Sequence, residues 1–591
     1  MIVATTNQNI AYYYSYDAAN RLTGVTDSNL HNIDYQYDVA GNRTAMTTPD
    51  GKTIKYEYNA NNQMTKILTN RGNYTFTYDA LNRRIKRTLP NGTFTTYAYD
   101  QNSRLTNITH KNNHNKIIDS FSYTHDNVGN RLTKTEEASS PHDLDKTINY
   151  AYDAIYRLQA ATPEKRGKGK LAEAINKYQA ENYSYDAVGN RQSGPHSRDA
   201  YSYNAGNELL TSTGRIIFDR DNQYEYDLNG NLIKKTQTIK GKWSIVTTYA
   251  YDDENRLIEV KIQKGHKIKE VSFTYDPLGR RISKTVHKEE FVDDEEDGDN
   301  DNDKGKDEEK DKFNKHHYPK TTYYVYDDQN IIAEYDENNR LIASYIHGPN
   351  IDEPLSAEIR NDWIYYHADG LGSITALTSH MGHAVQRYEY DSFGNMKPHP
   401  HWIKQPYTYT GREFDQETGL YYYRARYYDA KAGRFLQRDP ILHPAIGNYR
   451  SCRGISSTYQ NFLPAFEKLI RNPQNLNHYA YAKNNPLKYI DPLGLACGSD
   501  WNEPIVPDDW GLWDFTGPCE IHDYCYSSYC GVSKLICDLE FFGNMMGVCM
   551  TSGPSFPLCT GVANLYYLAV TVGAWPAYFN AQKVVCDHCN E

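Results

Sequence analysis

A histidine set among acids and cysteines stands near the end of the chain. The local sequence reads Cys519-Glu-Ile-His522-Asp523-Tyr-Cys525-Tyr526, then Cys530-Gly531, then Cys537-Asp538. If both segments are helices that reverse at the glycine, antiparallel pairing makes His522 face Asp538. The same pairing brings Cys525 within disulfide reach of Cys537. A histidine paired to one carboxylate, with Asp523 beside it, is typical of a general base next to a cation site.

Cysteine is concentrated at this end of the chain. Nine of the ten cysteines lie in the last 95 residues, and only Cys452 precedes them. This density predicts a disulfide-stapled domain made for an oxidising compartment. Cys586-Asp587-His588-Cys589 could contribute to a zinc site, but disulfides are the simpler interpretation. The odd count allows at most four internal disulfides and leaves at least one thiol unpaired or bound outside the domain.

Upstream of these cysteines, one short pattern recurs along most of the chain. Tyr-x-Tyr-Asp, with Phe or Asn as variants, ends at Asp17, Asp38, Asn59, Asp79 and Asp100, so the spacing is 20 or 21 residues. Alternating tyrosines share one face of a strand, Asp-x-x-Gly-Asn supplies a turn, and the following Arg begins the return strand. Each unit is therefore predicted to be a hairpin. Because one hairpin cannot bury its aromatic face alone, neighbours must stack into a continuous all-β strip or coil.

This pattern resembles the YD repeats of RHS and teneurin-type proteins over most of residues 11–430. The segments Gly411-Arg-Glu-Phe-Asp415, Gly419-Leu-Tyr-Tyr-Tyr-Arg424-Ala-Arg426-Tyr-Tyr-Asp429 and Asp491-Pro-Leu-Gly-Leu495 resemble the RHS-associated core, interrupted by an insertion between Ile441 and Asn477. The resemblance implies a hollow β shell that holds a variable toxin. It also implies chain cleavage between Leu495 and Ala496, with Asp439 and Asp491 as the candidate acids, although Asp-Pro at both places could equally just begin a turn.

The cysteine-rich pattern itself resembles the secreted phospholipase A2 superfamily over residues 497–542. By that resemblance His522 is the base, Asp538 orients it and Tyr526 supports Asp538. Asp523 would bind Ca²⁺ with a loop at Cys497-Gly498-Ser499-Asp500, whose Cys497 would pair with Cys519. The implied reaction is hydrolysis of the sn-2 ester of a membrane glycerophospholipid.

The predicted organisation therefore has three parts. Residues 1–440 form the YD-repeat shell, residues 441–495 end the core, and residues 496–591 form a small, disulfide-rich α-helical toxin domain. The net charge of −11 comes mainly from an acidic insertion at 293–312, which contributes −8. No clustered basic face indicates nucleic-acid binding.

Two other functions remain open: a non-enzymatic surface adhesin, and a membrane-inserting or pore-forming tail based on residues 556–579. The first residues of the chain have no Sec signal. We therefore expect secretion by another delivery machinery, or a missing upstream part. The family resemblance further implies a cognate immunity protein and action at a target-cell membrane.

Overall fold

The computed structural model describes residues 2–5, 11–138, 146–164, 180–195, 201–214, 221–239, 243–287, 290–291, 319–397, 402–440, 474, 477–495 and 499–500. The regular elements in these ranges are strands, with short 3₁₀ turns at η2 (Tyr409–Gly411) and η5 (Ala482–Asn484). Within the described residues, no helix has the length and apolarity needed to cross a bilayer. The acidic insertion and residues 501–591 lie outside these ranges.

The strands form a wall with antiparallel neighbours in chain order, except that β27 (Glu290–Phe291) pairs with β25 and β26 pairs directly with β28. The first 16-stranded sheet contains β1 (Ile2–Thr5), β2 (Ala11–Tyr16), β3 (Leu22–Asp27), β4 (Asn32–Tyr37), β5 (Arg43–Thr47), β6 (Thr53–Tyr58), β7 (Met64–Thr69), β8 (Gly72–Tyr78), β9 (Arg84–Thr88), β10 (Phe94–Tyr99), β11 (Leu105–Lys111), β12 (Ile117–His125), β13 (Arg131–Ala138), β14 (Lys146–Tyr152), β15 (Leu158–Pro163) and β16 (Glu181–Asn182). A two-stranded sheet follows, made of β17 (Ser184–Tyr185) and β18 (Arg191–Ser193).

The second 16-stranded sheet continues the wall. It contains β19 (Ser202–Tyr203), β20 (Leu209–Ser212), β21 (Asp221–Tyr226), β22 (Leu232–Ile239), β23 (Trp243–Tyr251), β24 (Leu257–Lys264), β25 (Lys267–Tyr275), β26 (Arg281–Val286), β27 (Glu290–Phe291), β28 (Lys320–Asp327), β29 (Asn330–Asp336), β30 (Leu341–His347), β31 (Pro354–Ile359), β32 (Asp362–Ala368), β33 (Ile374–Ser379) and β34 (Ala384–Arg387).

Each repeat is a hairpin, as the sequence predicts, and β8–β9 shows its construction. The Asp79 carboxylate accepts the backbone N–H groups of Leu81 and Arg83, both at 2.9 Å, and the Arg83 Nε–H at 2.7 Å. Asn82 takes a left-handed φ of 64°, a conformation that asparagine tolerates better than most residues. The aspartate therefore ties the turn together, and the arginine fastens the return strand to it.

The tyrosines of the repeat line the concave side of the wall. Phe76 is an almost fully buried member of a core cluster, and the partly buried Tyr78 packs against that cluster. The second tyrosine of a unit also reaches the preceding hairpin, because the Tyr78 hydroxyl donates to the Met64 carbonyl at 2.8 Å. The same contact recurs from Tyr58 to the Arg43 carbonyl. Adjacent units are thus joined by side chains as well as by the strand ladder.

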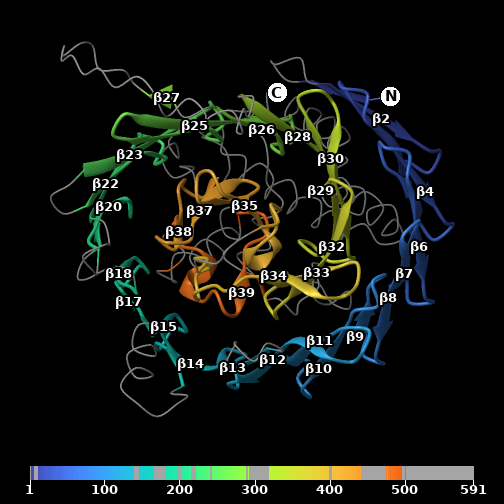
Figure 1. Cartoon of the computed structure of the whole chain (residues 1–591). Helices are drawn as coiled ribbons and strands as arrows, with labels where there is room; N and C mark the ends of the chain where they lie inside the picture. The colour runs from blue at the N-terminus through green and yellow to red at the C-terminus, as the bar shows by residue number, and fades with distance from the viewer. Residues whose placement is uncertain are drawn as a thin grey trace, which may run out of the picture.

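The wall coils on itself by more than one turn. Strands β28–β34 lie inside β2–β12, which gives two layers on that side of the ring (Figure 1). Arg43 bonds both oxygens of Asp327, and Arg84 contacts Glu353 at 2.6 Å across the two layers. Burial of Ile33, Ile67 and Leu355 between the layers supplies the apolar core. This overlap closes the ring.

The end of the described chain fills the centre of the ring. Strands β35 (Glu413–Asp415), β36 (Leu420–Tyr423), β37 (Arg426–Asp429) and β38 (Arg434–Phe435) form a small sheet. Strand β39 (Tyr489–Ile490) pairs with β40 (Ser499–Asp500). The four-stranded sheet and β39 lie inside the wall (Figure 1). We call residues 402–440 and 477–495 the plug.

Candidate self-cleavage site in the plug

Arg426 is the organising side chain of the plug, and it lies at the start of β37. Its guanidinium is 2% exposed and stacks 3.8 Å from the ring centre of Phe435. One nitrogen, Nη2, lies 3.1 Å from Asp439 Oδ2 and 3.3 Å from Asp491 Oδ2. The two aspartates proposed from sequence are therefore brought to a single cation, although 52 positions separate them in the chain.

Asp491 opens the turn that leads to the predicted cleavage point. It is fully buried, and its Oδ1 accepts the Leu495 N–H at 3.0 Å. Arg426 Nε donates to the Gly494 carbonyl, and the backbone N–H of Ala425 donates to the Leu493 carbonyl at 3.2 Å. The segment from Asp491 to Leu495 is thus bound along its length by β37 and the residues before it.

Gly494 is required in this turn. Its φ is +68°, and a Cβ at this position would lie 2.2 Å from the Tyr423 carbonyl oxygen. Neither the backbone conformation nor the available space accommodates a larger residue. The glycine therefore allows the chain to pass against β36 and β37 just before residue 495.

Asp439 approaches the same place from the end of the β38 segment. Its backbone N–H donates to the His478 carbonyl at 3.0 Å, and Arg426 Nη1 donates to that carbonyl at 2.9 Å. The Asp439 side chain is nearly buried. Two carboxyl groups can serve as the base and the acid in the hydrolysis of a peptide bond, and here Arg426 brings them together beside a fixed peptide turn.

Buried ion pairs hold the plug to the wall. Arg281 of β26 contacts Glu413 at 2.8 Å and Asp415 at 2.5 Å, and all three side chains are at most 3% exposed. Burial alone would raise the pKa of Asp415, but Arg281 and Lys284 hold it below its ordinary value. Since charges this deep are costly unless paired, these contacts fix where the plug sits.

The other predicted site residues fall outside the part of the chain that can be described. These are Cys497, Gly498, Cys519, His522, Asp523, Cys525, Tyr526, Cys537 and Asp538. Asp500 is described as backbone only, in β40. The predicted domain boundaries, Ca²⁺ site and disulfides stay predictions. Among the described residues, no cluster of His, Cys, Asp and Glu could hold a metal ion.

Sequence reasoning missed Arg426 and Gly494. Arg426 lies in the Arg424-Ala-Arg426-Tyr run that we assigned to the core as a whole, and nothing in its spacing separates it from Arg424. The available signal was the glycine at the fourth position of Asp-Pro-Leu-Gly-Leu, which is typical of a turn with positive φ.

Two family models match the wall. The RHS repeat model matches residues 16–53, 37–75, 58–93 and 78–113, and the teneurin YD-shell model matches residues 131–292. The wall is therefore similar to a YD-repeat shell over residues 16–113 and 131–292. The prediction of an all-β shell is confirmed. Neither family model matches the cysteine-rich end of the chain.

Two curated relatives are similar to this chain in sequence, and one solved structure shares its fold. The chain is 28% identical over 319 residues to the tRNA nuclease WapA of Bacillus subtilis, covering 53% of this chain and 11% of WapA. It is 25% identical over 383 residues to double-stranded DNA deaminase toxin A of Burkholderia cenocepacia, covering 59% and 22%. The crystal structure of TcdB2-TccC3 without its hypervariable C-terminal region matches with a TM-score of 0.51 and 16% identity, covering 83% of this chain and 24% of that chain. The chain thus spans between a tenth and a quarter of the length of these relatives.

Proposed function

We propose that this chain belongs to an RHS-type toxin whose shell encloses its own C-terminal part and cuts it free after Leu495. The observation that carries the proposal is the meeting of Asp439 and Asp491 on Arg426, inside the ring and next to the Leu495 peptide. Two of the relatives are named as a nuclease and a deaminase toxin, and the solved complex shares the shell fold. A cut but enclosed effector would protect the producing cell until delivery.

The cleavage chemistry follows from the two carboxyl groups. One carboxylate takes a proton from a water molecule, whose oxygen bonds to the Leu495 carbonyl carbon. The other group, as the neutral acid, gives its proton to the Ala496 nitrogen when the C–N bond breaks. Arg426 keeps both side chains in place and holds the Gly494 carbonyl, so that the peptide cannot turn away.

We further propose that residues 496–591 are a calcium-dependent phospholipase A2. The support is the order and spacing of the Cys-x-x-His-Asp-x-Cys-Tyr and Cys-Asp motifs. His522 would take a proton from the water that attacks the sn-2 ester, with Asp538 orienting the imidazole and Tyr526 supporting Asp538. Ca²⁺, when bound at Asp523, would supply charge for the phosphate and the oxyanion. Fatty acid and lysophospholipid are the products.

Release of fatty acid from mixed phospholipid vesicles tests the lipase proposal. The expected result is release by the wild-type protein in calcium, and none with EGTA or with His522→Gln. The proposal would be refuted if the wild-type protein releases no fatty acid after it has been opened to expose residues 496–591. Vesicle leakage without hydrolysis would favour the pore-forming alternative instead. Asp491→Asn and Asp439→Asn test the cleavage separately, because each should leave the chain uncut.

A further inference from the structure

Residues 424–426 of the plug hold the carbonyl groups of residues 492–494, one to one, just before the predicted cleavage point. The contacts of Ala425 and Arg426 with this turn lie within the plug. Arg424 Nη1 donates to the Pro492 carbonyl, next to the peptide of Asp491. The same guanidinium also reaches the wall, so the position of the turn depends on a contact outside the plug.

Asp352 is the wall residue that Arg424 reaches. It lies in the turn between β30 and β31, and its Oδ1 is 2.7 Å from Arg424 Nη2 and 2.7 Å from Arg412 Nη1. The side chain is 5% exposed. Burial alone would raise the pKa of Asp352, but Arg412 and Arg424 hold it below its ordinary value. Because a buried carboxylate needs such partners, this contact fixes the Arg424 side chain against the wall.

The backbones of the wall turn and the plug fit each other closely at this contact. Asp352 has a φ of 54° and Arg424 a φ of 55°, a region that residues other than glycine seldom occupy. A Cβ on the plug residue Gly411 would lie 2.1 Å from the Asp352 carbonyl oxygen. Backbone strain of this kind persists where the surrounding contacts over-determine the conformation. The wall turn and the plug are therefore held in one arrangement.

The next residue of the same turn, Glu353, makes its contacts with the outer layer of the wall. Glu353 Oε1 is 2.6 Å from Arg84 Nη1 of β9 and 3.4 Å from Arg87 Nη1. Strand β9 belongs to the first 16-stranded sheet, whereas the turn belongs to the second. Two adjacent residues thus connect the overlap of the layers, which closes the ring, to the side chain that holds the cleavage turn.

We propose that Asp352 is a positioning residue that makes cleavage after Leu495 conditional on closure of the ring. The inference rests on the proposed self-cleavage and adds its regulation. In an open ring Glu353 lacks its outer-layer partners, so the turn that carries Asp352 is not fixed and Arg424 is not held. A displacement of about 1 Å between reacting groups can cost on the order of 10²-fold in rate. The effector is therefore cut only after the shell has closed around it.

Substitutions that keep the size of the side chain test this path. Asp352→Asn removes the charge that holds Arg424, and Glu353→Gln weakens the contact with Arg84. We expect each to slow cleavage by about tenfold or more, although neither residue touches the peptide that is cut. The uncut fraction is followed on denaturing gels against time after cell-free synthesis of the full chain.

Arg424→Met separates positioning from a merely structural role. Asp352 keeps Arg412 as its partner in this variant, so the shell should fold and its denaturation midpoint should stay close to that of the wild-type protein. Cleavage should nevertheless slow by on the order of 10²-fold. Arg424→Lys, which keeps a charge and hydrogen-bond donors, should restore part of the rate.

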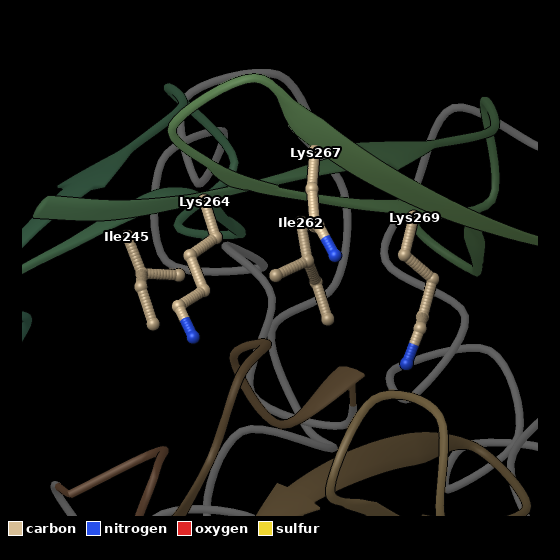
Figure 2. Close-up of a pocket in the computed structure, with 5 residues that line it drawn as sticks. All are labelled: Ile245, Ile262, Lys264, Lys267 and Lys269. Carbon is tan, nitrogen blue, oxygen red and sulfur yellow. The ribbon is translucent and has the colours of Figure 1, made fainter. Parts of the chain in front are cut away.

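Two control variants remove wall charges that lie off this path. Glu358 of β31 is 15% exposed, against 11% for Glu353, and pairs with Lys52 of the outer layer at 2.9 Å. Glu358→Gln is therefore the matched control for Glu353→Gln. Lys269 projects from the inner face of the wall beside a pocket of about 290 Å³ (Figure 2), and Lys269→Gln is the control for a distant charge. Both variants should be cut at the wild-type rate.

Cleavage of Asp352→Asn and Glu353→Gln at the wild-type rate would overturn the inference, and so would equal slowing in Glu358→Gln. A lowered midpoint in Arg424→Met without rescue by Arg424→Lys would also overturn it, because that result indicates a structural role. Failure of the proposed function has a different readout. A wild-type chain that is never cut refutes the self-cleavage itself, whereas a wild-type chain that is cut no faster than Asp352→Asn refutes the coupling alone.

Discussion

Substitution of Gly494 by alanine tests whether the plug positions the peptide that is cut. The new Cβ would lie 2.2 Å from the Tyr423 carbonyl oxygen and 3.1 Å from the Arg426 nitrogen, and both obstacles are backbone atoms. The turn must therefore shift by about 1 Å, a displacement that can cost on the order of 10²-fold in rate when reacting groups are misplaced. We expect cleavage after Leu495 to slow by about that factor, although neither aspartate has been changed.

Gly419→Ala is the matched control. Gly419 also has a positive φ, of 75°, but a Cβ there meets nothing within 4 Å. It should cost about 1 kcal/mol of conformational strain and leave cleavage intact. The assay follows the uncut fraction over time after synthesis, on denaturing gels, with circular dichroism to show that both variants fold. Equal cleavage in the two variants would refute the positioning argument.

Three further outcomes are expected. Arg281→Met leaves Asp415 buried without its main cation, so the free energy of unfolding measured by chemical denaturation should fall by about 3–5 kcal/mol. An unchanged denaturation midpoint would contradict this expectation. Burial is the largest single effect on the pKa of His31, and it lowers that pKa. The hydrogen bond and the charge of Asp27, together with the hydrogen bond to Asn339, outweigh burial and raise the pKa above its ordinary value. The pair therefore contributes its full stability at low pH, and that contribution is lost as the pH rises through the folded-state pKa. The free energy of unfolding of the wild-type protein should exceed that of His31→Gln at about pH 5.5, and the difference should disappear near pH 8.5. EGTA should abolish fatty-acid release as fully as His522→Gln does, and calcium-independent hydrolysis would exclude the assigned metal role.

The wall could be predicted from the sequence because the residues that define each hairpin lie close together in the chain. Tyr78, Asp79 and Arg83 lie within six positions, and their spacing alone indicates strand, turn and return strand. What joins the ring is not local: Arg43 binds Asp327 across 284 positions. No periodicity in a single sequence pairs such residues, so the overlap of the two layers had to come from the structure.

Some residues of the candidate site could be predicted from the sequence, and others could be found only from the structure. Asp439 and Asp491 stand in recognisable Asp-Pro dipeptides, and the core resemblance was enough to select them. Arg426 meets them only when β37, the end of β38 and the turn after β39 are packed together. Its role depends on tertiary contacts that no spacing rule contains.

The most direct test of the account is the state of the native protein after purification. Size-exclusion chromatography should give one folded peak, and the intact mass of that peak should show two polypeptides, the smaller one starting at Ala496 and retained by the shell. Asp491→Asn should give the same peak with a single chain of 591 residues. A wild-type peak that holds only the uncut chain, or a fragment that elutes apart from the shell, would contradict the proposed enclosure and cleavage.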